Sequence, residues 1–227
     1  KKKKSGAVGN GDKLAYSLVS VSGNTLTVQQ DAQMIGNNLT VTPGGRIIYD
    51  STAQKTILFW PDPTNNYMSI LCMDVGSSSI TFGTQVNRPT NRYFVDSNMD
   101  ATFVPGVNKV GYCYDVYSGS EANTLRIGIL SLSGTTITVN EQELLDHGNV
   151  DEYVGIRMSA DNNGKVLITY DDNDASNTDK LRAIMGSYSG TTFTSTLSDF
   201  TIIDNLVYAR PFSQCFTDST NNKFVHC

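Results

Sequence analysis

The residues best suited to chemistry are carboxylates in a polar loop between two apolar stretches. Asp172, Asp174 and Asp179 belong to this loop. Spaced carboxylates can bind Ca²⁺, which prefers oxygen ligands. The loop lacks the glycine of an EF-hand, and Ala183 stands where the closing glutamate of that motif would be. The pattern therefore favours a solvated loop, with a calcium site at the three aspartates as the alternative and no other cofactor expected.

A second set of aspartates, Asp62, Asp115 and Asp171, recurs with an internal period, each directly or shortly after an aromatic position. A catalytic residue is needed once, whereas every repeating unit must turn the chain, so we interpret these aspartates as turn residues. The motifs H-x-x-x-H, C-x-x-C, P-loop and G-x-S-x-G are absent from the sequence. No glutamates are paired as in a glycosidase; the four are Glu121, Glu141, Glu143 and Glu152. The sequence predicts no catalytic residue and a protein that is not an enzyme.

The four cysteines do not predict a disulfide framework. Cys72 occupies an apolar column of the repeat and is expected to be a buried thiol. Cys113 and Cys227 share one repeat position in different units, too far apart to bond. Cys215 and Cys227 fall on the two strands of one predicted hairpin, where a disulfide is an open alternative.

These residues are positioned by a repeat of about 54–58 residues. The lysines that open one strand of each unit are spaced by 54, 56 and 58 residues; they are Lys55, Lys109, Lys165 and Lys223. The apolar residues after a Ser-Gly or Gly-Ser turn are spaced by 54, 57 and 56 residues; they are Leu26, Ile80, Ile137 and Phe193. A fixed period of this size predicts a solenoid, a propeller or an array.

Each unit has the alternation of β-strands. A first strand precedes the lysine, the lysine-led strand is deep, an apolar strand follows, and a Thr-rich strand lies outermost. We predict an all-β fold: a β-propeller of four-stranded antiparallel blades, with about four blade equivalents. The expected boundaries are a tail at 1–11, half a blade at 12–36, blades at 44–88, 92–145 and 152–205, and half a blade at 209–227.

Two sets of equivalent residues are predicted to be buried. One set is aromatic: Trp60, Tyr114 and Tyr170. The other contains Leu18, Cys72, Ile129 and Met185. The stretch from Glu141 to Asp146 is the one place where a helical turn is considered.

The composition limits the function classes. Charged residues make up 17%, the net charge is −5 and the pI is about 4.9, which argues against nucleic-acid binding. No apolar stretch has the length of a membrane span. The many Asn, Thr, Ser and Gly residues are typical of extracellular or virion surfaces. We expect a segment of a longer polypeptide, with closure of the two half-blades into a ring of four as the competing interpretation.

The repeats also resemble a known family. Lys165 to Asp171 (KVLITYD), Ser189 to Thr194 (SGTTFT) and Ser78 to Gly83 (SSITFG) are similar to propeller repeats of marine phage and virus tail or fibre proteins, and of related microbial surface proteins. Trp60-Pro61 departs from the pattern. The resemblance implies a non-enzymatic structural or adhesion module, at a virion or extracellular surface, that binds other protein subunits or surface glycans. The alternatives are a carbohydrate-active hydrolytic propeller and an intracellular scaffold of WD40 type, whose signatures the sequence lacks.

Two segments, Asn87–Asn108 and Asn140–Asp151, interrupt the period and hold residues that the repeat does not demand. Arg92, Tyr93 and Phe94 lie in the first. Aromatic and arginine residues often anchor protein contacts, so we predict an interface there, or alternatively an innermost strand. Asn38 begins an N-glycosylation sequon, which matters only in a eukaryotic secretory protein.

Overall fold

The computed structural model describes residues 15–35, 45–62, 67–89, 98–116, 124–146, 152–173, 179–206, 215–218, 220–221 and 223–226. These residues form strands and turns, which confirms the all-β class. Every strand pairing among them is antiparallel, so the units are not stacked as in a parallel solenoid. Within these ranges, no helix has the length and apolarity that crossing a bilayer demands.

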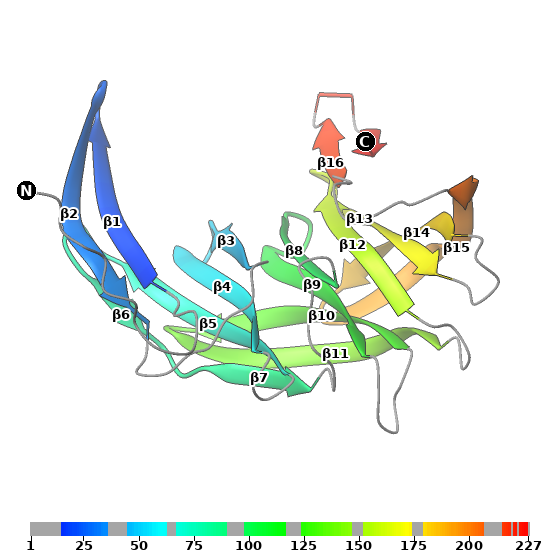
Figure 1. The fold of residues 1–227 in the computed structure, drawn as a ribbon, viewed down its shortest axis with the longest axis horizontal. Helices are drawn as coiled ribbons and strands as arrows, with labels where there is room; N and C mark the ends of the chain where they lie inside the picture. Colours follow the sequence, from blue (N-terminus) through cyan, green and yellow to red (C-terminus); the bar gives the residue numbers. More distant parts are fainter. Residues whose placement is uncertain are drawn as a thin grey trace, which may run out of the picture.

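The strands form three larger sheets between two hairpins (Figure 1). The N-hairpin contains β1 (Ala15–Ser22) and β2 (Thr25–Met34). Sheet I contains β3 (Arg46–Asp50), β4 (Lys55–Asp62), β5 (Tyr67–Val75), β6 (Ile80–Phe82) and β7 (Val86–Pro89). Sheet II contains β8 (Met99–Val104), β9 (Lys109–Val116), β10 (Thr124–Ser133) and β11 (Thr136–Asp146).

Sheet III contains β12 (Glu152–Ala160), β13 (Lys165–Asn173), β14 (Asp179–Ser189) and β15 (Thr192–Leu206). The C-hairpin contains β16 (Cys215–Asp218) and β17 (Lys223–His226). The N-hairpin and the C-hairpin lie at opposite ends of the array and form separate sheets, so they do not pair into a ring of four in this structure (Figure 1).

The predicted strand order is confirmed. Sheets II and III run in sequence order from the first strand to the Thr-rich strand at the far edge, with the lysine-led strand in second place. The lysine-led strand of sheet III pairs antiparallel with the apolar strand that follows it, with Lys165 opposite Ser187 and Tyr170 opposite Arg182. The turn before the Thr-rich strand has glycine at positive φ, with φ of 59° at Gly23 and 60° at Gly134, which glycine adopts without a steric penalty.

Sheet I has a divided outer edge. The strand β6 pairs with the end of β5 (Met73–Val75), whereas β7 pairs with its beginning (Tyr67–Ile70). Gly83 lies at the break, and a Cβ atom there would come within 2.1 Å of the Thr135 carbonyl oxygen of sheet II. The break therefore brings sheet II close to the edge of sheet I.

The apolar core lies between successive sheets. One cluster joins sheets I and II, a second joins sheets II and III, and a third joins the N-hairpin to sheet I. The aromatic set is buried as predicted, with exposed fractions of 1%, 1% and 0% for Trp60, Tyr114 and Tyr170. The other predicted set is half right: Cys72 and Ile129 are buried, but Leu18 and Met185 are only half-buried.

Two local predictions are wrong. Glu141–Asp146 is not a helical turn but the second half of β11, because pairing with β10 continues to Asp146 across a bulge. Asp115 and Asp171 are not turn residues but lie inside β9 and β13, and both are buried. The turns are made by a different aspartate column. Asp50 Oδ1 accepts the Ala53 amide at 2.8 Å, and Asp161 Oδ1 accepts the Lys165 amide at 2.7 Å.

Candidate functional site

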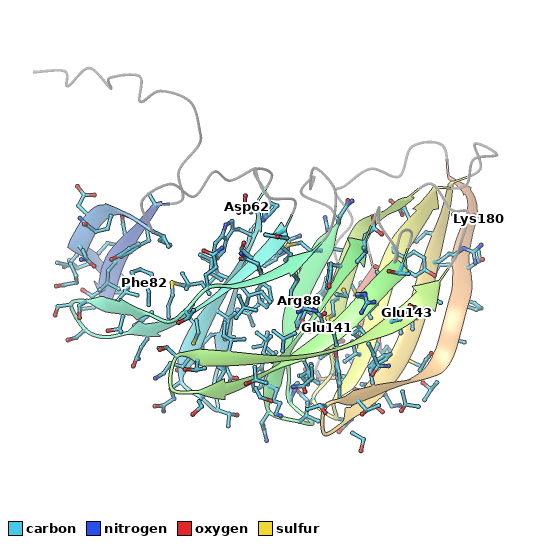
Figure 2. The ribbon with its side chains drawn as sticks, turned by 90° about the horizontal axis from the view of Figure 1, so that it is seen from below. Asp62, Phe82, Arg88, Glu141, Glu143 and Lys180 are labelled. Atoms are coloured by element: carbon cyan, nitrogen blue, oxygen red, sulfur yellow. The ribbon has the colours of Figure 1, made fainter. Side chains whose placement is uncertain are left out.

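The two aperiodic segments meet at an ion pair between sheets I and II. Arg88 of β7 donates from Nε to Glu141 Oε1 at 2.7 Å, and its Nη2 donates to Glu141 Oε2. This two-point pairing is the strongest geometry between guanidinium and carboxylate. Figure 2 shows the two side chains side by side, with Glu143 farther along β11. The glutamate is the buried partner, with 4% of its side chain exposed against 30% for the arginine.

Two tyrosines of β9 complete the surroundings of the carboxylate. Tyr112 donates to Glu141 Oε1 at 2.5 Å, and Tyr114 donates to Glu141 Oε2 at 3.3 Å. Residues two apart on a strand face the same side, so the two rings stack, with centroids 6.2 Å apart. Four donors from two strands, β7 and β9, thus converge on one glutamate of β11, which compensates for its removal from water. We call Arg88, Tyr112, Tyr114 and Glu141 the Glu141 cluster.

The electrostatics of the Glu141 cluster favour neutral tyrosines and a charged arginine. Burial, followed by the negative charge of Glu141, raises the pKa of Tyr112 and of Tyr114. Burial alone would lower the pKa of Arg88, but the hydrogen bond and charge of Glu141 outweigh it, and the pKa lies above its usual value. At neutral pH the two tyrosines therefore stay protonated and Arg88 stays charged.

The next residue of β11 binds the opposite neighbour. Gln142 donates from Nε2 to the Phe193 carbonyl at 2.8 Å and accepts from the Phe193 amide at Oε1 at 2.9 Å. Its amide thus pairs with the backbone of β15 as a neighbouring strand would. Tyr188 of β14 adds a bond from its hydroxyl to the Gly128 carbonyl of β10, at 2.7 Å. Sheets II and III are therefore joined by polar contacts that mimic strand pairing.

A further set of charges lies on the first strands of the sheets. Arg46 of β3 donates to Asp100 Oδ1 of β8 at 2.8 Å, and Asp100 Oδ2 accepts the Met158 amide of β12 at 2.8 Å. Asp100 therefore spans from sheet I to sheet III. Arg157, the adjacent residue of β12, is 5% exposed; burial lowers its pKa and the nearby charge of Asp100 opposes this effect.

Arg46, Asp100 and Arg157 occupy equivalent positions, since their strand partners are Phe59, Cys113 and Thr169. The charge at this column alternates in sign from sheet to sheet. Because the sign alternates, the Asp100 carboxylate has a basic residue at the equivalent position of each neighbouring sheet. This arrangement explains how the repeat can keep a column of charged residues in a buried place. The sequence reading did not identify this column, although a search for periodic charge would have found it.

Asp171 is placed by a bulge in the neighbouring strand. Gly155, at φ of 64°, lies in the register shift of β12, and a Cβ atom there would come within 2.8 Å of Asp171 Oδ2. Only glycine satisfies both the backbone angle and the space at this point. Burial lowers the pKa of Arg157, and the negative charge of Asp171, like that of Asp100, opposes this effect.

The sequence-predicted site residues fall mostly at the margins of the structure. The backbones of Asp172 and Asp179 lie at adjoining ends of β13 and β14, since Asp172 pairs with Lys180. Asp174, Asn38, and Arg92, Tyr93 and Phe94 lie outside the described residues, so the calcium, glycosylation and interface predictions stay predictions. Among the side chains that the structure describes, no three His, Cys, Asp or Glu residues gather as metal ligands.

The cysteines are described in part. Cys72 and Cys113 are buried, and burial raises the pKa of both thiols, which makes them poor nucleophiles. Cys215 pairs across the C-hairpin with His226, and Cys227 lies outside the described residues. The disulfide alternative is therefore untested.

Comparison with known proteins adds no assignment: neither a scan against protein-family models nor a search of curated proteins found a match to this chain. The Glu141 cluster and the alternating charges are thus interpreted from their geometry. Both join sheets to each other.

Proposed function

We propose that this chain is a non-enzymatic structural or adhesion module of β-propeller type, in an extracellular or virion assembly of the tail or fibre kind. It contacts other protein subunits or surface glycans. The resemblance of its repeats to such proteins motivates the proposal. The antiparallel sheets, each packed against the next, are the architecture that such a module requires.

The observation that carries the proposal is how the buried carboxylates are used. Glu141 accepts from Arg88 and two tyrosines, and Asp100 accepts from Arg46 and a backbone amide. Hydrolysis of a glycoside by paired carboxylates needs one acid and one base that face a substrate cleft about 5–9 Å apart. Each of these carboxylates instead binds at least one donor of a neighbouring sheet, Arg88 for Glu141 and Arg46 and the Met158 amide for Asp100, which suits a scaffold.

The proposal is tested by measuring glycan binding and glycan turnover with the same protein. We expect retention of surface glycans or partner subunits on an array, without product from a panel of chromogenic glycosides. Turnover that is abolished by D100N or E141Q, in variants that keep the strand signal in circular dichroism, would assign the chain to the hydrolytic class instead.

A further inference from the structure

Sheet I departs from the other two larger sheets in one row of residues that pair across its strands. In sheets II and III, the buried aromatic residue of the lysine-led strand pairs with an arginine; the pairs are Tyr114 with Arg126 and Tyr170 with Arg182. In sheet I, Trp60 pairs with Ser69 instead. Ser69 is fully buried, and its partner on the outer strand is Asn87 of β7. Neutral hydrogen-bonding groups therefore stand in this row where the repeat otherwise places an arginine.

Three of these neutral side chains are bonded to one another. Ser69 Oγ donates to Asn87 Oδ1 at 3.0 Å. Gln85, just before β7, donates from Nε2 to Asn87 Oδ1 at 2.7 Å and to Ser69 Oγ at 3.1 Å. We call Ser69, Gln85 and Asn87 the Asn87 triad. Its mutual hydrogen bonds fix the orientation of both amides on one face of the sheet, opposite to the face from which Arg88 reaches Glu141.

The Asn87 triad leaves one acceptor and one donor unused. Gln85 Oε1 and Asn87 Nδ2 make no hydrogen bond to any residue that the structure describes. Asn87 is exposed and Gln85 is half-buried, so the two amides lie at the surface. An acceptor and a donor held side by side match a ligand that carries both kinds of group.

An aromatic side chain lies beside the triad. Tyr67 and Ser69 are two residues apart on β5, so they face the same side of sheet I. Tyr67 is half-buried, which leaves part of its ring accessible. An aromatic ring offers an apolar surface to the C–H groups of a sugar, while amides exchange hydrogen bonds with its hydroxyls. A few fixed polar groups next to an aromatic surface are typical of a small-ligand site.

We propose that Tyr67, Gln85 and Asn87 form a binding site for a neutral glycan. Asn87 Nδ2 donates to a sugar oxygen, and Gln85 Oε1 accepts from a neighbouring hydroxyl or from the N–H of an N-acetyl group. The Tyr67 ring packs against the sugar ring. The inference rests on the proposed function and deepens it, because it assigns glycan contact to one place on the molecule.

The charge of the site selects a neutral ligand. Trp60, Ser69 and Asn87 carry no charge, whereas the same row of sheet II places Arg126 opposite Glu143. The whole chain has a net charge of −5, which repels anions. A sulfated or carboxylated glycan therefore gains no ion pair within this row and is repelled by the chain as a whole.

Trp60 is a reporter next to the site. It is the single tryptophan of the chain and the strand partner of Ser69. Its indole N–H is buried and has no hydrogen-bond acceptor within the described ranges. Buried donors are nearly always paired, so this one should respond to a polar group brought to the neighbouring triad. We therefore expect a bound glycan to shift the fluorescence emission of Trp60.

The first test titrates neutral oligosaccharides into the full chain and follows binding by calorimetry and by Trp60 fluorescence. The probes are cellopentaose, maltopentaose and chitopentaose, with a heparin oligosaccharide as the anionic comparison. We expect at least one neutral probe to bind and to shift the emission, and the heparin probe to bind more weakly. Absence of binding by all three neutral probes, or binding that leaves the emission unchanged, would overturn the proposal.

The second test removes the contacts one at a time. The variant N87D keeps an oxygen for Ser69 but loses the donor, and Q85A loses the acceptor. Each should weaken binding of the neutral probe by about tenfold or more, because a sugar hydroxyl is left unpaired. Y67A should weaken binding too, whereas Y67F should retain it because the ring remains. The control Q29A removes a Gln-to-Ser hydrogen bond of 2.9 Å on the N-hairpin and should leave binding unchanged.

Circular dichroism verifies that each variant keeps its strands before binding is compared. Parent-level affinity in N87D, Q85A and Y67A would overturn the assignment of the site. If these variants and the parent all retain glycans or partner subunits on an array, the proposed function stands and only this site is wrong. If the parent retains neither glycans nor subunits, the proposed function fails as well.

Discussion

Glu141 and Gln142 are consecutive residues of one strand that bind two different sheets. The Glu141 carboxylate accepts from Arg88 of sheet I, whereas the Gln142 amide pairs with the Phe193 backbone of sheet III. Neighbouring side chains of a strand point to opposite faces, so β11 can join both neighbours without any loop. The aperiodic end of β11 therefore connects sheet II to both sheet I and sheet III.

We predict that Q142E keeps one of the two hydrogen bonds made by the Gln142 side-chain amide and breaks the other. The new carboxylate can still accept from the Phe193 amide, but it repels the Phe193 carbonyl, to which Gln142 now donates. The variant should lose about 1–3 kcal/mol of unfolding free energy, measured by urea denaturation at neutral pH. Lowering the pH until the new carboxyl is protonated should restore part of the loss. An unchanged unfolding free energy at neutral pH would contradict the assigned contact.

Alkaline pH should weaken the Glu141 cluster. The pKa values of Tyr112 and Tyr114 are raised above the ordinary value of 10.0, so the folded state binds these protons more tightly than the unfolded state. Their contribution to stability is complete below pH 10 and is lost as pH rises toward the folded pKa values. Unfolding free energy measured from pH 8 to 11.5 should fall above about pH 10.

The double variant Y112F/Y114F serves as the matched control for this pH effect. Its unfolding free energy should fall less steeply above pH 10, since phenylalanine has no proton to lose. Tyr188, Cys72 and Cys113, whose pKa values burial also raises, contribute to the remaining slope. Parallel pH profiles for the variant and the parent protein would show that the two phenols are not buried in the folded state.

Burial should decide how equivalent core positions respond to truncation. Ile129 is fully buried and its repeat equivalent Met185 is only half-buried. We expect I129A to lower the unfolding free energy by about 2–4 kcal/mol and M185A by less, since less of a cavity is created at the second site. Denaturation of the two variants in parallel checks this order. Equal losses would contradict the difference in packing between the sheets.

Much of the fold follows from the alternation and period of the sequence. The column from Trp60 through Tyr114 to Tyr170 predicts a buried face because an apolar residue at a fixed step along strands marks a packed surface. The prediction fails at Leu18 and Met185, where burial depends on what covers the strand rather than on the residue itself. The end of β11 was missed because Glu and Asp disfavour strands, and pairing with β10 overrides that preference.

The site is harder to predict than the fold. Arg88 and Glu141 are 53 residues apart and belong to no repeated column, so no pattern links them. Their meeting depends on the divided edge of sheet I and on the full length of β11. Arg46 and Asp100, by contrast, stand 54 residues apart at equivalent positions, and an alternating charge at one period is visible in the sequence.

The central claim, that the aperiodic charges hold sheets together, is tested most directly by a double-mutant cycle of R88M and E141Q in urea denaturation. E141Q alone should lose about 3 kcal/mol of unfolding free energy because it leaves a partly buried arginine without its carboxylate. The double variant should lose less than the sum of the two single variants, by about 1–3 kcal/mol. The control E143Q, at an exposed position of the same strand, should change stability by less than about 0.5 kcal/mol. Additive losses within about 0.5 kcal/mol would contradict the claim.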